Sequence, residues 1–594
     1  MKFDDFLTLI NDWGRYQKVK YTAICLTCML PSIMVYTYSF TAATPNFRCR
    51  NPSQWLNDSY SETSNSIFNE EYRPTKEQCL SNKKSISLKE CQRCFIRSTS
   101  FNNQSMDDIL KSCQSYVFDR QYYKDTLIEE WRMVCNRVIY RSWAQMIFFL
   151  GYMVGSILFG ILADKHGRRI MMGISFILMT FSSFLCTFAP QQSFGFWPSY
   201  IIFVLARFLL ACSTRGISVC GFVLASEIVG PKKRLLAGIV IEYFFASGQL
   251  ILLIFAYFIR SWRMLTLSIA LFTVPYMFFY FILPESPRWL ISTGRFDEGE
   301  KILQNIAKIN NRVFNIDAYK KLKDEQIKNM SEKKNQPGVR SLFQSKIMTF
   351  ISINLFFQWL VQNLTYYGVA QSTGSWRLNP YLSFGVSAFV ELLSYFFVHS
   401  ILDRIGRKIP YIGFLILFCI VSILILPVEY LMEKDGKGQI LLLNIINGTL
   451  KFLSSGSYAI IYIYANELFP TNVRNTGMGI CSMVARIGAI IGTYANDNLT
   501  RLWIHLPILS YGTVSFIAAL FALMFPETLN QPLPQSVDDV EKMNLINIRI
   551  YRSKRLINDN TQINEQSMKR FAPNINPQSN NNESQNKTEQ VERF

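Results

Sequence analysis

Charged and catalytic residue types are scarce in this chain. Only 17% of its 594 residues are Asp, Glu, Lys or Arg, and the three histidines are His166, His399 and His505. The sequence has no HExxH zinc motif, no GxxxxGK[ST] phosphate loop and no GxSxG nucleophile elbow. These absences argue against catalysis and against direct use of ATP. We therefore predict that the protein is not an enzyme and uses no cofactor or metal.

Apolar residues are abundant instead, at 49% of the chain. They gather into twelve stretches of about 20 residues, the length that crosses a bilayer as a helix. The sequence thus predicts an all-α membrane protein with twelve transmembrane helices. The stretches lie near residues 21–43, 142–163, 170–189, 200–224, 235–258, 263–283, 346–369, 380–402, 409–428, 439–463, 478–497 and 504–525.

The formal net charge of +19 comes largely from basic loops between these stretches. Short loops at 164–169, 231–234 and 403–408, and the long segment 284–345, are rich in Lys and Arg and alternate with loops that are not. Because Lys and Arg are retained on the cytoplasmic side of membranes, we expect these loops and both termini to be cytoplasmic. Nucleic-acid binding is disfavoured, since the basic residues do not group on a soluble face.

Three charged signatures occur twice, about 240 residues apart. Residues 164–169 (DKHGRR) return as 403–408 (DRIGRK), Glu227 returns as Glu467, and Pro284-Glu285-Ser286 returns as Pro526-Glu527-Thr528. A parallel duplication of a helical bundle is typical of two-lobed transporters with a substrate path between the lobes.

The duplication sets the expected domains. We predict an N-terminal lobe at 21–283 and a C-terminal lobe at 346–525, joined by a cytoplasmic linker at 284–345. A short cytoplasmic segment, 1–20, precedes them. The tail, 526–594, is rich in Asn, Gln and Ser and is expected to be mostly disordered.

The loop 49–140 is expected to be extracellular. It holds six of the thirteen cysteines, and an even number in a non-cytosolic loop indicates disulfides that order a small cap, with fifteen possible pairings. Zinc binding by the CxxC at 91–94 is the weaker alternative, because no second ligand pair has suitable spacing. Asn57 and Asn103 begin possible glycosylation sequons. The six cysteines are Cys49, Cys79, Cys91, Cys94, Cys113 and Cys135.

The signature loops at 160–169 and 284–288 resemble those of the major facilitator superfamily. The segments 44–49, 466–475 and 526–530, together with the cysteine-rich loop, resemble the organic cation, carnitine and organic anion transporter family within it. One departure is His399, which stands where the second copy of the signature loop would begin with glycine.

The resemblance implies two six-helix lobes that alternate access to a central cavity. It also implies a charge network on the cytoplasmic side, whose pairs would hold the lobes together until transport breaks them. In this chain that network comprises Asp164, Arg168, Arg169, Glu227, Glu285, Arg288, Asp403, Arg407, Glu467 and Arg474.

The sign of the substrate's charge is indicated by ionisable residues inside the apolar stretches, which are costly there unless paired or functional. Four stand out: Arg215, Glu242, Glu391 and Arg486. The position that Arg486 matches in the resembling family is acidic in cation carriers and often arginine in anion and carnitine carriers. An arginine there suits a carboxylate. The alternative is that Glu242 or Glu391 neutralises the arginines internally.

Aromatic and amide residues recur at helical spacing along 359–367, and Tyr458 and Tyr462 form a similar pair. Such a face suits flat organic bodies and quaternary ammonium groups, although packing is the ordinary role of most aromatics. The predicted substrate-binding residues are Arg486, Arg215, Trp359, Gln362, Tyr366, Tyr367, Glu391 and Tyr458.

We therefore predict a secondary active or facilitative transporter of small organic ions, with anions or zwitterions such as carnitine favoured. An organic cation transporter and a sugar/proton symporter of the same superfamily are the alternatives, followed by a receptor-like protein that has lost transport. A coupling ion or counter-substrate stays open. The expected setting is a monomer in the lipid bilayer of the plasma membrane, reached by a secretory route that fits disulfides and glycans.

Overall fold

The computed structural model is almost entirely helical and describes most of the chain. The described residues are 3–52, 58–81, 88–102, 105–189, 195–230, 233–332, 342–372, 376, 378–433, 436–470, 473–529, 534 and 540. Asn57, Asn103 and nearly all of the predicted disordered tail lie outside them.

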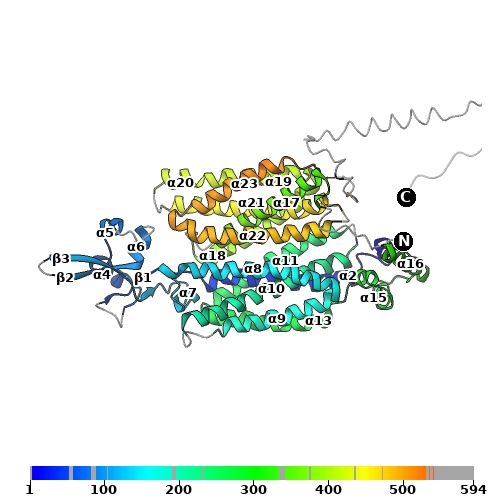
Figure 1. The fold of residues 1–594 in the computed structure, drawn as a ribbon, viewed down its shortest axis with the longest axis horizontal. Coiled ribbons are helices and arrows are strands. Elements are labelled where there is room, and N and C mark those ends of the chain that lie inside the picture. The colour runs from blue at the N-terminus through cyan, green and yellow to red at the C-terminus, as the bar shows by residue number, and fades with distance from the viewer. Residues whose placement is uncertain are drawn as a thin grey trace, which may run out of the picture. The chain divides into compact units, whose positions relative to one another are not determined.

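The helices follow the predicted order, and several of them extend beyond the apolar stretches (Figure 1). The helix α10, for example, has 33 residues and is about 50 Å long, whereas the hydrocarbon core is about 30 Å thick. We call the following elements the N-half: α2 Arg15–Thr27, α3 Met29–Thr41, α8 Val138–His166, α9 Arg168–Thr187, α10 Phe196–Ile228, α11 Arg234–Phe258, α12 Trp262–Thr273, a 3-10 turn Val274–Phe278 and α13 Phe279–Ile282. We call α17–α23 the C-half: α17 Lys346–Gln371, α18 Pro380–Ile405, α19 Lys408–Ile423, α20 Ile425–Leu431, α21 Lys437–Leu468, α22 Arg474–Leu502 and α23 Leu506–Ala522.

Ten helical segments of the described chain are long and apolar enough to cross a membrane. They correspond to ten of the twelve predicted stretches. The helix α21 is not among the ten, and α23 is a shorter apolar helix of 17 residues.

The duplicated loops have the same backbone geometry. Gly167 ends α8 with φ 100°, and Gly406 ends α18 with φ 104°. Only glycine adopts this conformation readily, and an added Cβ would also meet the carboxylate of Glu285 at 2.4 Å or of Glu527 at 2.6 Å. By contrast, a Cβ on Gly160 would meet nothing within 4 Å, so the first copy makes no close helix approach at the position that His399 matches.

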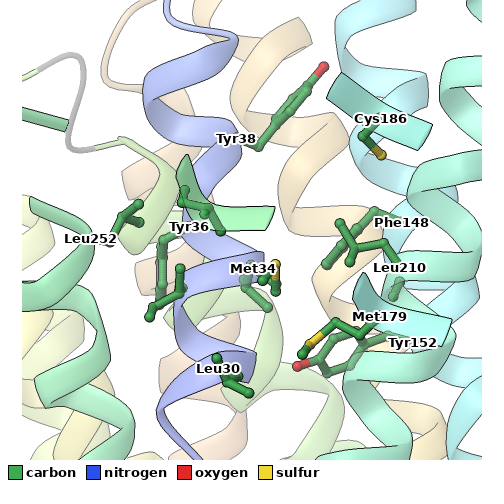
Figure 2. Close-up of a cluster of buried hydrophobic side chains, with 14 of the residues drawn as sticks. Leu30, Met34, Tyr36, Tyr38, Phe148, Tyr152, Met179, Cys186, Leu210 and Leu252 are labelled. Carbon is green, nitrogen blue, oxygen red and sulfur yellow. The ribbon is translucent and has the colours of Figure 1, made fainter. Parts of the chain in front are cut away.

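Each half contains a large hydrophobic cluster. In the N-half, side chains of α3 such as Met34 and Tyr38 face those of α8, α9 and α10, including Phe148, Met179 and Leu210 (Figure 2). In the C-half, two clusters lie among α17, α19, α21, α22 and α23. The N-half cluster also includes C-half residues such as Tyr366 and Phe384, so it extends across the interface between the halves.

The N-terminal segment and the linker pack against each other rather than standing apart. The helices α1 Phe3–Leu9, α14 Pro287–Ser292, α15 Phe296–Ile309 and α16 Ile316–Glu332 share one apolar cluster. Asn310 joins them: its Nδ2 donates to the carbonyls of Ile10 and Asn11, and its Oδ1 accepts the Tyr16 N–H at 3.0 Å. The described helices α1, α14, α15 and α16 of the segments predicted as 1–20 and 284–345 therefore form one helical layer.

The predicted disulfides of the cap are present. They join Cys49 to Cys113, Cys79 to Cys91 and Cys94 to Cys135. The two cysteines of the CxxC thus have different partners, which leaves no thiolate pair there for zinc. The cap comprises β1 Phe47–Cys49 paired with β4 Tyr116–Phe118, β2 Phe95–Asn102 paired with β3 Ser105–Ser112, and the short helices α4 Glu62–Glu71, α5 Lys76–Ser81, α6 Leu88–Cys94 and α7 Leu127–Glu130, followed by a 3-10 turn Cys135–Arg137.

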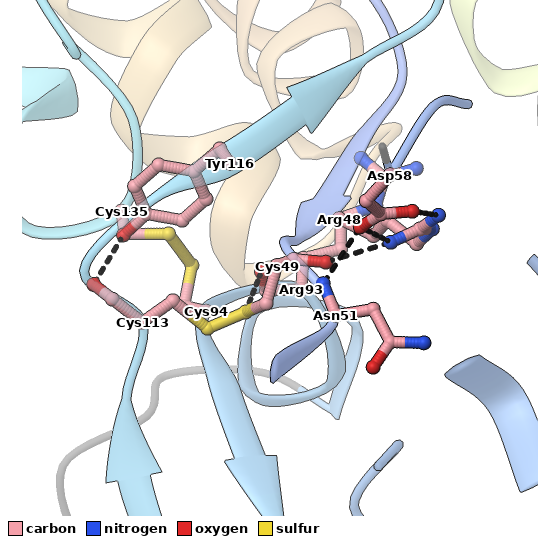
Figure 3. Close-up of a disulfide and its surroundings, with 9 residues drawn as sticks. All are labelled: Arg48, Cys49, Asn51, Asp58, Arg93, Cys94, Cys113, Tyr116 and Cys135. Carbon is pink, nitrogen blue, oxygen red and sulfur yellow. Dashed lines mark hydrogen bonds and ion pairs between the residues drawn. A yellow bond between two sulfur atoms is a disulfide. The ribbon is translucent and has the colours of Figure 1, made fainter. Parts of the chain in front are cut away.

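A buried ion pair lies beside these disulfides (Figure 3). The Arg48 guanidinium donates to both oxygens of Asp58, with Nη2 to Oδ1 at 2.6 Å and Nη1 to Oδ2 at 2.8 Å. The Asn51 N–H and the Ser64 hydroxyl also donate to this carboxylate, each at 2.6 Å. Burial raises the pKa of Asp58, but these hydrogen bonds outweigh burial and hold the pKa below its ordinary value of 3.8.

Substitution of Asp58 by Asn should destabilise the cap by about 3–5 kcal/mol, because Arg48 would stay buried without a counter-charge. The measurement is the rate of proteolysis within the cap of the purified protein, which follows the population of the opened cap. The control is Glu70→Gln, a charge removal at an exposed position of α4. Equal proteolysis of Asp58→Asn and wild type would contradict a stabilising role for the pair.

The pair also predicts a loss of cap stability in acid. The pKa of Asp58 is lower in the folded cap than in the unfolded chain. Its contribution to the stability of the cap is therefore complete above pH 3.8 and is lost as the pH falls through the pKa of the folded cap. Proteolysis by an acid-active protease should therefore accelerate below about pH 4 in wild type and change less in Asp58→Asn.

Candidate functional site

The N-half copy of the charge network surrounds Arg168. Its Nη2 lies 3.0 Å from Asp164 Oδ1 and 3.3 Å from Glu227 Oε1. The carboxylate of Glu285 accepts the backbone N–H groups of Arg168 at 2.9 Å and of Arg169, which are the first residues of α9. A carboxylate at a helix N-terminus is favoured by the unpaired N–H groups and the helix dipole.

The C-half repeats this arrangement around Arg407. Its Nη2 lies 3.1 Å from Glu467 Oε1 and 3.6 Å from Asp403 Oδ1. Glu527 accepts the N–H groups of Arg407 at 2.9 Å and of Lys408 at 3.0 Å, at the start of α19. The sequence duplication is therefore also a duplication of contacts.

Three other predicted members of the network have different partners. Arg169 Nε donates to the Tyr280 carbonyl at 2.9 Å, and Arg474 Nε donates to the Phe469 carbonyl at 3.2 Å. Arg288 forms an ion pair with Asp4 of α1.

Among the described side chains, the ion pairs of Arg168 and Arg407 each stay within one half, and that of Arg288 joins the linker to the N-terminal segment. The hypothesis that these pairs hold the halves together does not describe this structure, because each arginine and its acceptors come from neighbouring helices of the same half. Here the network fixes the packing of α8, α9 and α10, and of α18, α19 and α21.

The two halves contact each other near the cap instead. The Phe40 ring of α3 stacks on Tyr381 of α18, with centroids 5.8 Å apart, and meets Phe384 at 4.8 Å. The Tyr381 hydroxyl donates to the Tyr122 carbonyl at 2.8 Å. The halves are thus closed against each other at the end that carries the cap.

Deeper between the halves, two of the predicted arginines flank one tyrosine. The guanidinium carbon of Arg486, from α22, lies 4.9 Å from the ring centroid of Tyr152, and that of Arg215, from α10, lies 5.8 Å from it. Arg215 reaches across to Ser482 of α22, with Nη2 to Oγ at 2.7 Å. The arginines therefore meet at the interface, one from each half.

Neither arginine forms an ion pair with a carboxylate of the described residues. Arg215 Nε donates to Ser156 at 2.8 Å, and Arg486 Nη1 lies 3.4 Å from Asn363 Oδ1 and from the Tyr367 hydroxyl. These partners are neutral. The alternative was that Glu242 or Glu391 neutralises the arginines. In this structure Glu391 forms its ion pair with a different residue.

Glu391 pairs with Lys451, a residue that the sequence interpretation overlooked. Lys451 Nζ of α21 lies 2.7 Å from Glu391 Oε2 of α18, and both side chains are fully buried. The hydroxyls of Tyr366 and Tyr395 donate to Glu391 Oε1 at 2.7 and 2.8 Å. In the sequence, Lys451 is a single charged residue within the apolar stretch 439–463, and this isolation could have identified it as a residue that needs a partner.

This buried pair also joins the two halves. Gln249 Nε2 of α11 donates to Glu391 Oε2 at 3.1 Å, and the Tyr36 hydroxyl of α3 donates to that of Tyr366 at 3.0 Å. Both donors belong to the N-half. Glu391 is therefore an interface residue whose acceptor sites are already occupied by protein donors.

The predicted aromatic residues form a continuous layer near the arginines. Tyr366 stacks on Tyr458 with centroids 5.2 Å apart, and Trp359 lies 6.1 Å from Tyr458 and 5.4 Å from Tyr462. Tyr367 meets Tyr366 edge-on at 5.1 Å. Residues from α17 and α21 thus share one aromatic wall.

Gln362 points away from this wall into the C-half. Its Nε2 donates to the Tyr411 hydroxyl at 3.1 Å, and its Oε1 accepts from Ser457 at 2.8 Å. Both hydrogen bonds stay within the C-half, so Gln362 contributes to the packing of that half and not to the interface between the halves.

The sequence analysis did not identify a further buried arginine, Arg207. Arg207 of α10 donates to Gln145 Oε1 at 2.7 Å, and its guanidinium lies 4.1 Å from the Tyr38 ring and 4.8 Å from that of Phe148. Like Lys451, it was a single charge within an apolar stretch of the sequence. It is enclosed by aromatic faces in the N-half core.

Comparison with solved structures identifies the architecture. The chain matches the E. coli xylose transporter XylE in an inward-open conformation with a TM-score of 0.59 and 15% identity, covering 89% of this chain and 99% of XylE. This likeness shows the fold alone. The fold is therefore that of XylE, which is a member of the major facilitator superfamily.

Sequence comparison identifies the family. The model for the sugar (and other) transporter family matches residues 90–536. The organic cation transporter-like protein of Drosophila melanogaster is 32% identical over 91% of this chain and 93% of its own length, and solute carrier family 22 member 7 of Rattus norvegicus is 27% identical over 91% and 98%. The chain belongs to solute carrier family 22, the organic cation and organic anion transporters of this superfamily. It is a multi-pass membrane protein and not an enzyme, and a plasma-membrane location is consistent with this family.

The pairing of Glu391 with Lys451 predicts a strong dependence of each residue on the other. Lys451→Met alone should lower stability by about 3–5 kcal/mol, because it leaves a buried carboxylate uncompensated, whereas the double variant Glu391→Gln/Lys451→Met should recover most of that loss. The measurement is the unfolding temperature of each purified variant in detergent.

The matched control is Lys437→Met, which removes a lysine from the exposed start of the same helix. It should leave the unfolding temperature unchanged. If the double variant is less stable than Lys451→Met by the full effect of Glu391→Gln, the two residues do not act as a pair.

Proposed function

We propose that this protein transports small organic anions or zwitterions, such as carnitine, by alternating access between its two halves. The observation that carries the proposal is the pair Arg215 and Arg486. They come from opposite halves, flank Tyr152 and have only neutral hydrogen-bond partners among the described residues. A permanent charge inside a membrane protein is costly unless a partner compensates it. A substrate carboxylate would supply that partner.

The proposed topology has twelve spans. To the ten helical segments it adds α21 and α23. The charges of α21 lie near its ends or, at Lys451, in an ion pair with Glu391, and the 17 residues of α23 are about 25 Å long. Both termini and the layer formed by α1, α14, α15 and α16 are then cytoplasmic, and the cap is extracellular, as the basic loops require.

The aromatic wall supports a role in binding the organic part of the substrate. The rings of Trp359, Tyr366 and Tyr458 lie together beside the interface, where they would take a flat body or a quaternary ammonium group by cation–π contact. Of the predicted set, Glu391 is better assigned to joining the halves and Gln362 to stabilising the C-half, because protein donors and acceptors already occupy them.

An organic cation is the second candidate. Glu242 of α11 is only half-buried, forms no ion pair with any described side chain, and lies within electrostatic reach of Arg215. The two Drosophila relatives at 32% identity are named as organic cation transporter proteins. A zwitterion unites both observations, with its carboxylate at the arginines and its ammonium group at the aromatic wall and Glu242.

The test is uptake of an aromatic carboxylate, carnitine and a quaternary ammonium cation by cells expressing each variant. In Arg486→Gln, uptake of the carboxylate and of carnitine should fall by about 10- to 100-fold, the effect of losing one charge-assisted hydrogen bond of about 1.5–3 kcal/mol. In Glu242→Gln, uptake of carnitine should fall while that of the aromatic carboxylate is retained.

Arg501→Gln is the matched control, since it removes an arginine from the end of the same helix α22. Its surface expression and uptake should equal those of wild type. Uptake of the quaternary ammonium cation alone, unchanged in Arg486→Gln and lost in Glu242→Gln, would replace the proposal by the cation transporter.

A further inference from the structure

A second polar site lies at the outer face of the N-half, away from the interface between the halves. A cavity of about 230 Å³ is lined by residues that follow α7 and residues that begin α10. No residue of the charge network or of the aromatic wall contributes to it. Its lining residues are Trp131, Arg132, Arg137, Gly195, Phe196 and Ser199.

The cavity is positively charged. Neither Arg132 nor Arg137 forms an ion pair with a carboxylate of the described chain, and both are exposed. The Arg137 guanidinium lies over the Phe196 ring, 4.9 Å from its centroid, which holds one arginine against the wall. The loop that carries both arginines is tied to the cap by the disulfide between Cys94 and Cys135.

The start of α10 adds a second source of positive potential. Gly195 is its N-cap residue and provides no side chain to cap the first N–H groups of this 33-residue helix. Free N–H groups and the helix dipole make such an N-terminus favourable for an anion. Gly195 and Phe196 both line the cavity, so this helix end faces the same space as the two arginines.

Ser199 is the third and independent feature. Its side chain is only 3% exposed, it lines the cavity, and its hydroxyl has no hydrogen-bond partner among the described residues. A buried hydroxyl without a partner is costly, and a serine in a helix would ordinarily bond to a carbonyl of the preceding turn. A ligand acceptor in the cavity would satisfy it.

Two guanidinium groups, a helix N-terminus and a free hydroxyl converge on one small volume. All are donors, so the geometry points to a tetrahedral oxyanion: we propose that this cavity binds a phosphate group. The volume is below the 300–1,000 Å³ of sites for drug-sized molecules, so the cavity suits a headgroup or free phosphate rather than a whole transported organic ion.

The surrounding surface favours a phospholipid as the source of that phosphate. Trp143 of α8 and Trp197 of α10 are 41% and 53% exposed, and Tyr140 packs between them with ring centroids 5.5 and 5.3 Å away. Exposed Trp and Tyr gather at the depth of lipid headgroups. The cavity therefore lies where the phosphodiester of a lipid in the leaflet on the cap side would meet the two arginines.

The test compares lipid retention and thermal stability of the full-length protein purified in mild detergent. Dioleoylphosphatidylcholine, dioleoylglycerol and inorganic phosphate are added separately to wild type, to Arg132→Gln/Arg137→Gln and to Ser199→Val. Bound lipid is counted by native mass spectrometry, and the unfolding temperature is recorded. Lys111→Gln, an exposed charge removal in β3 of the cap, is the control.

We expect the phospholipid, but not dioleoylglycerol, to be retained by wild type and Lys111→Gln and to raise their unfolding temperatures. Retention should fall at least tenfold in the double arginine variant and fall in Ser199→Val, while substrate uptake by both variants persists and shows that they fold. A rise with inorganic phosphate alone that both variants lose would assign the site to a free anion. Equal retention by wild type and both variants, or equal effects of dioleoylglycerol and phospholipid, would overturn the proposal.

Discussion

The cost of placing charge inside a membrane bundle is the constraint on which the rest of this structure depends. Apart from the half-buried Glu242, five ionisable side chains within the described membrane helices have three kinds of partner. Glu391 and Lys451 neutralise each other, and Arg207 is enclosed by aromatic faces and one amide. Among the described residues, the half-buried Arg215 and the buried Arg486 lie between the halves and have neutral hydrogen-bond partners. The distinction between structural and functional charge therefore rests on the partner, not on burial.

The same constraint explains the duplicated loops. An arginine that begins α9 or α19 is almost fully buried, so it needs carboxylates from neighbouring helices, and Glu227 and Glu467 supply them at equivalent positions. The backbone at each turn is paired as well, through Glu285 and Glu527, which leaves room only for glycine. Three separate signatures in the sequence are thus parts of one contact pattern that occurs once in each half.

Some features of the fold and of the candidate site were predictable from the sequence and others were not, for physical reasons. Span positions, the cap cysteines and the repeated loops were predictable, because apolar length, cysteine content and repetition are local or countable properties. The disulfide pairing and the partner of Glu391 were not, since each joins residues that only the tertiary fold brings together. Helical spacing placed Gln362 with Tyr366, but residues three and four apart span a wide arc, and Gln362 faces Tyr411 instead.

The position of the unpaired arginines bears on how binding and conformational change are linked. In this structure the halves touch near the cap through Phe40 and Tyr381, and deeper through the donors that reach Glu391. Near Tyr152, Arg215 and Arg486 bring like charges from opposite halves into electrostatic reach of each other, so their repulsion opposes closure there. An anion bound between them would convert that repulsion into attraction from both sides. Substrate binding and closure of the halves would then favour each other through one electrostatic contact, since a ligand shifts a conformational equilibrium only by its different affinity for the two states.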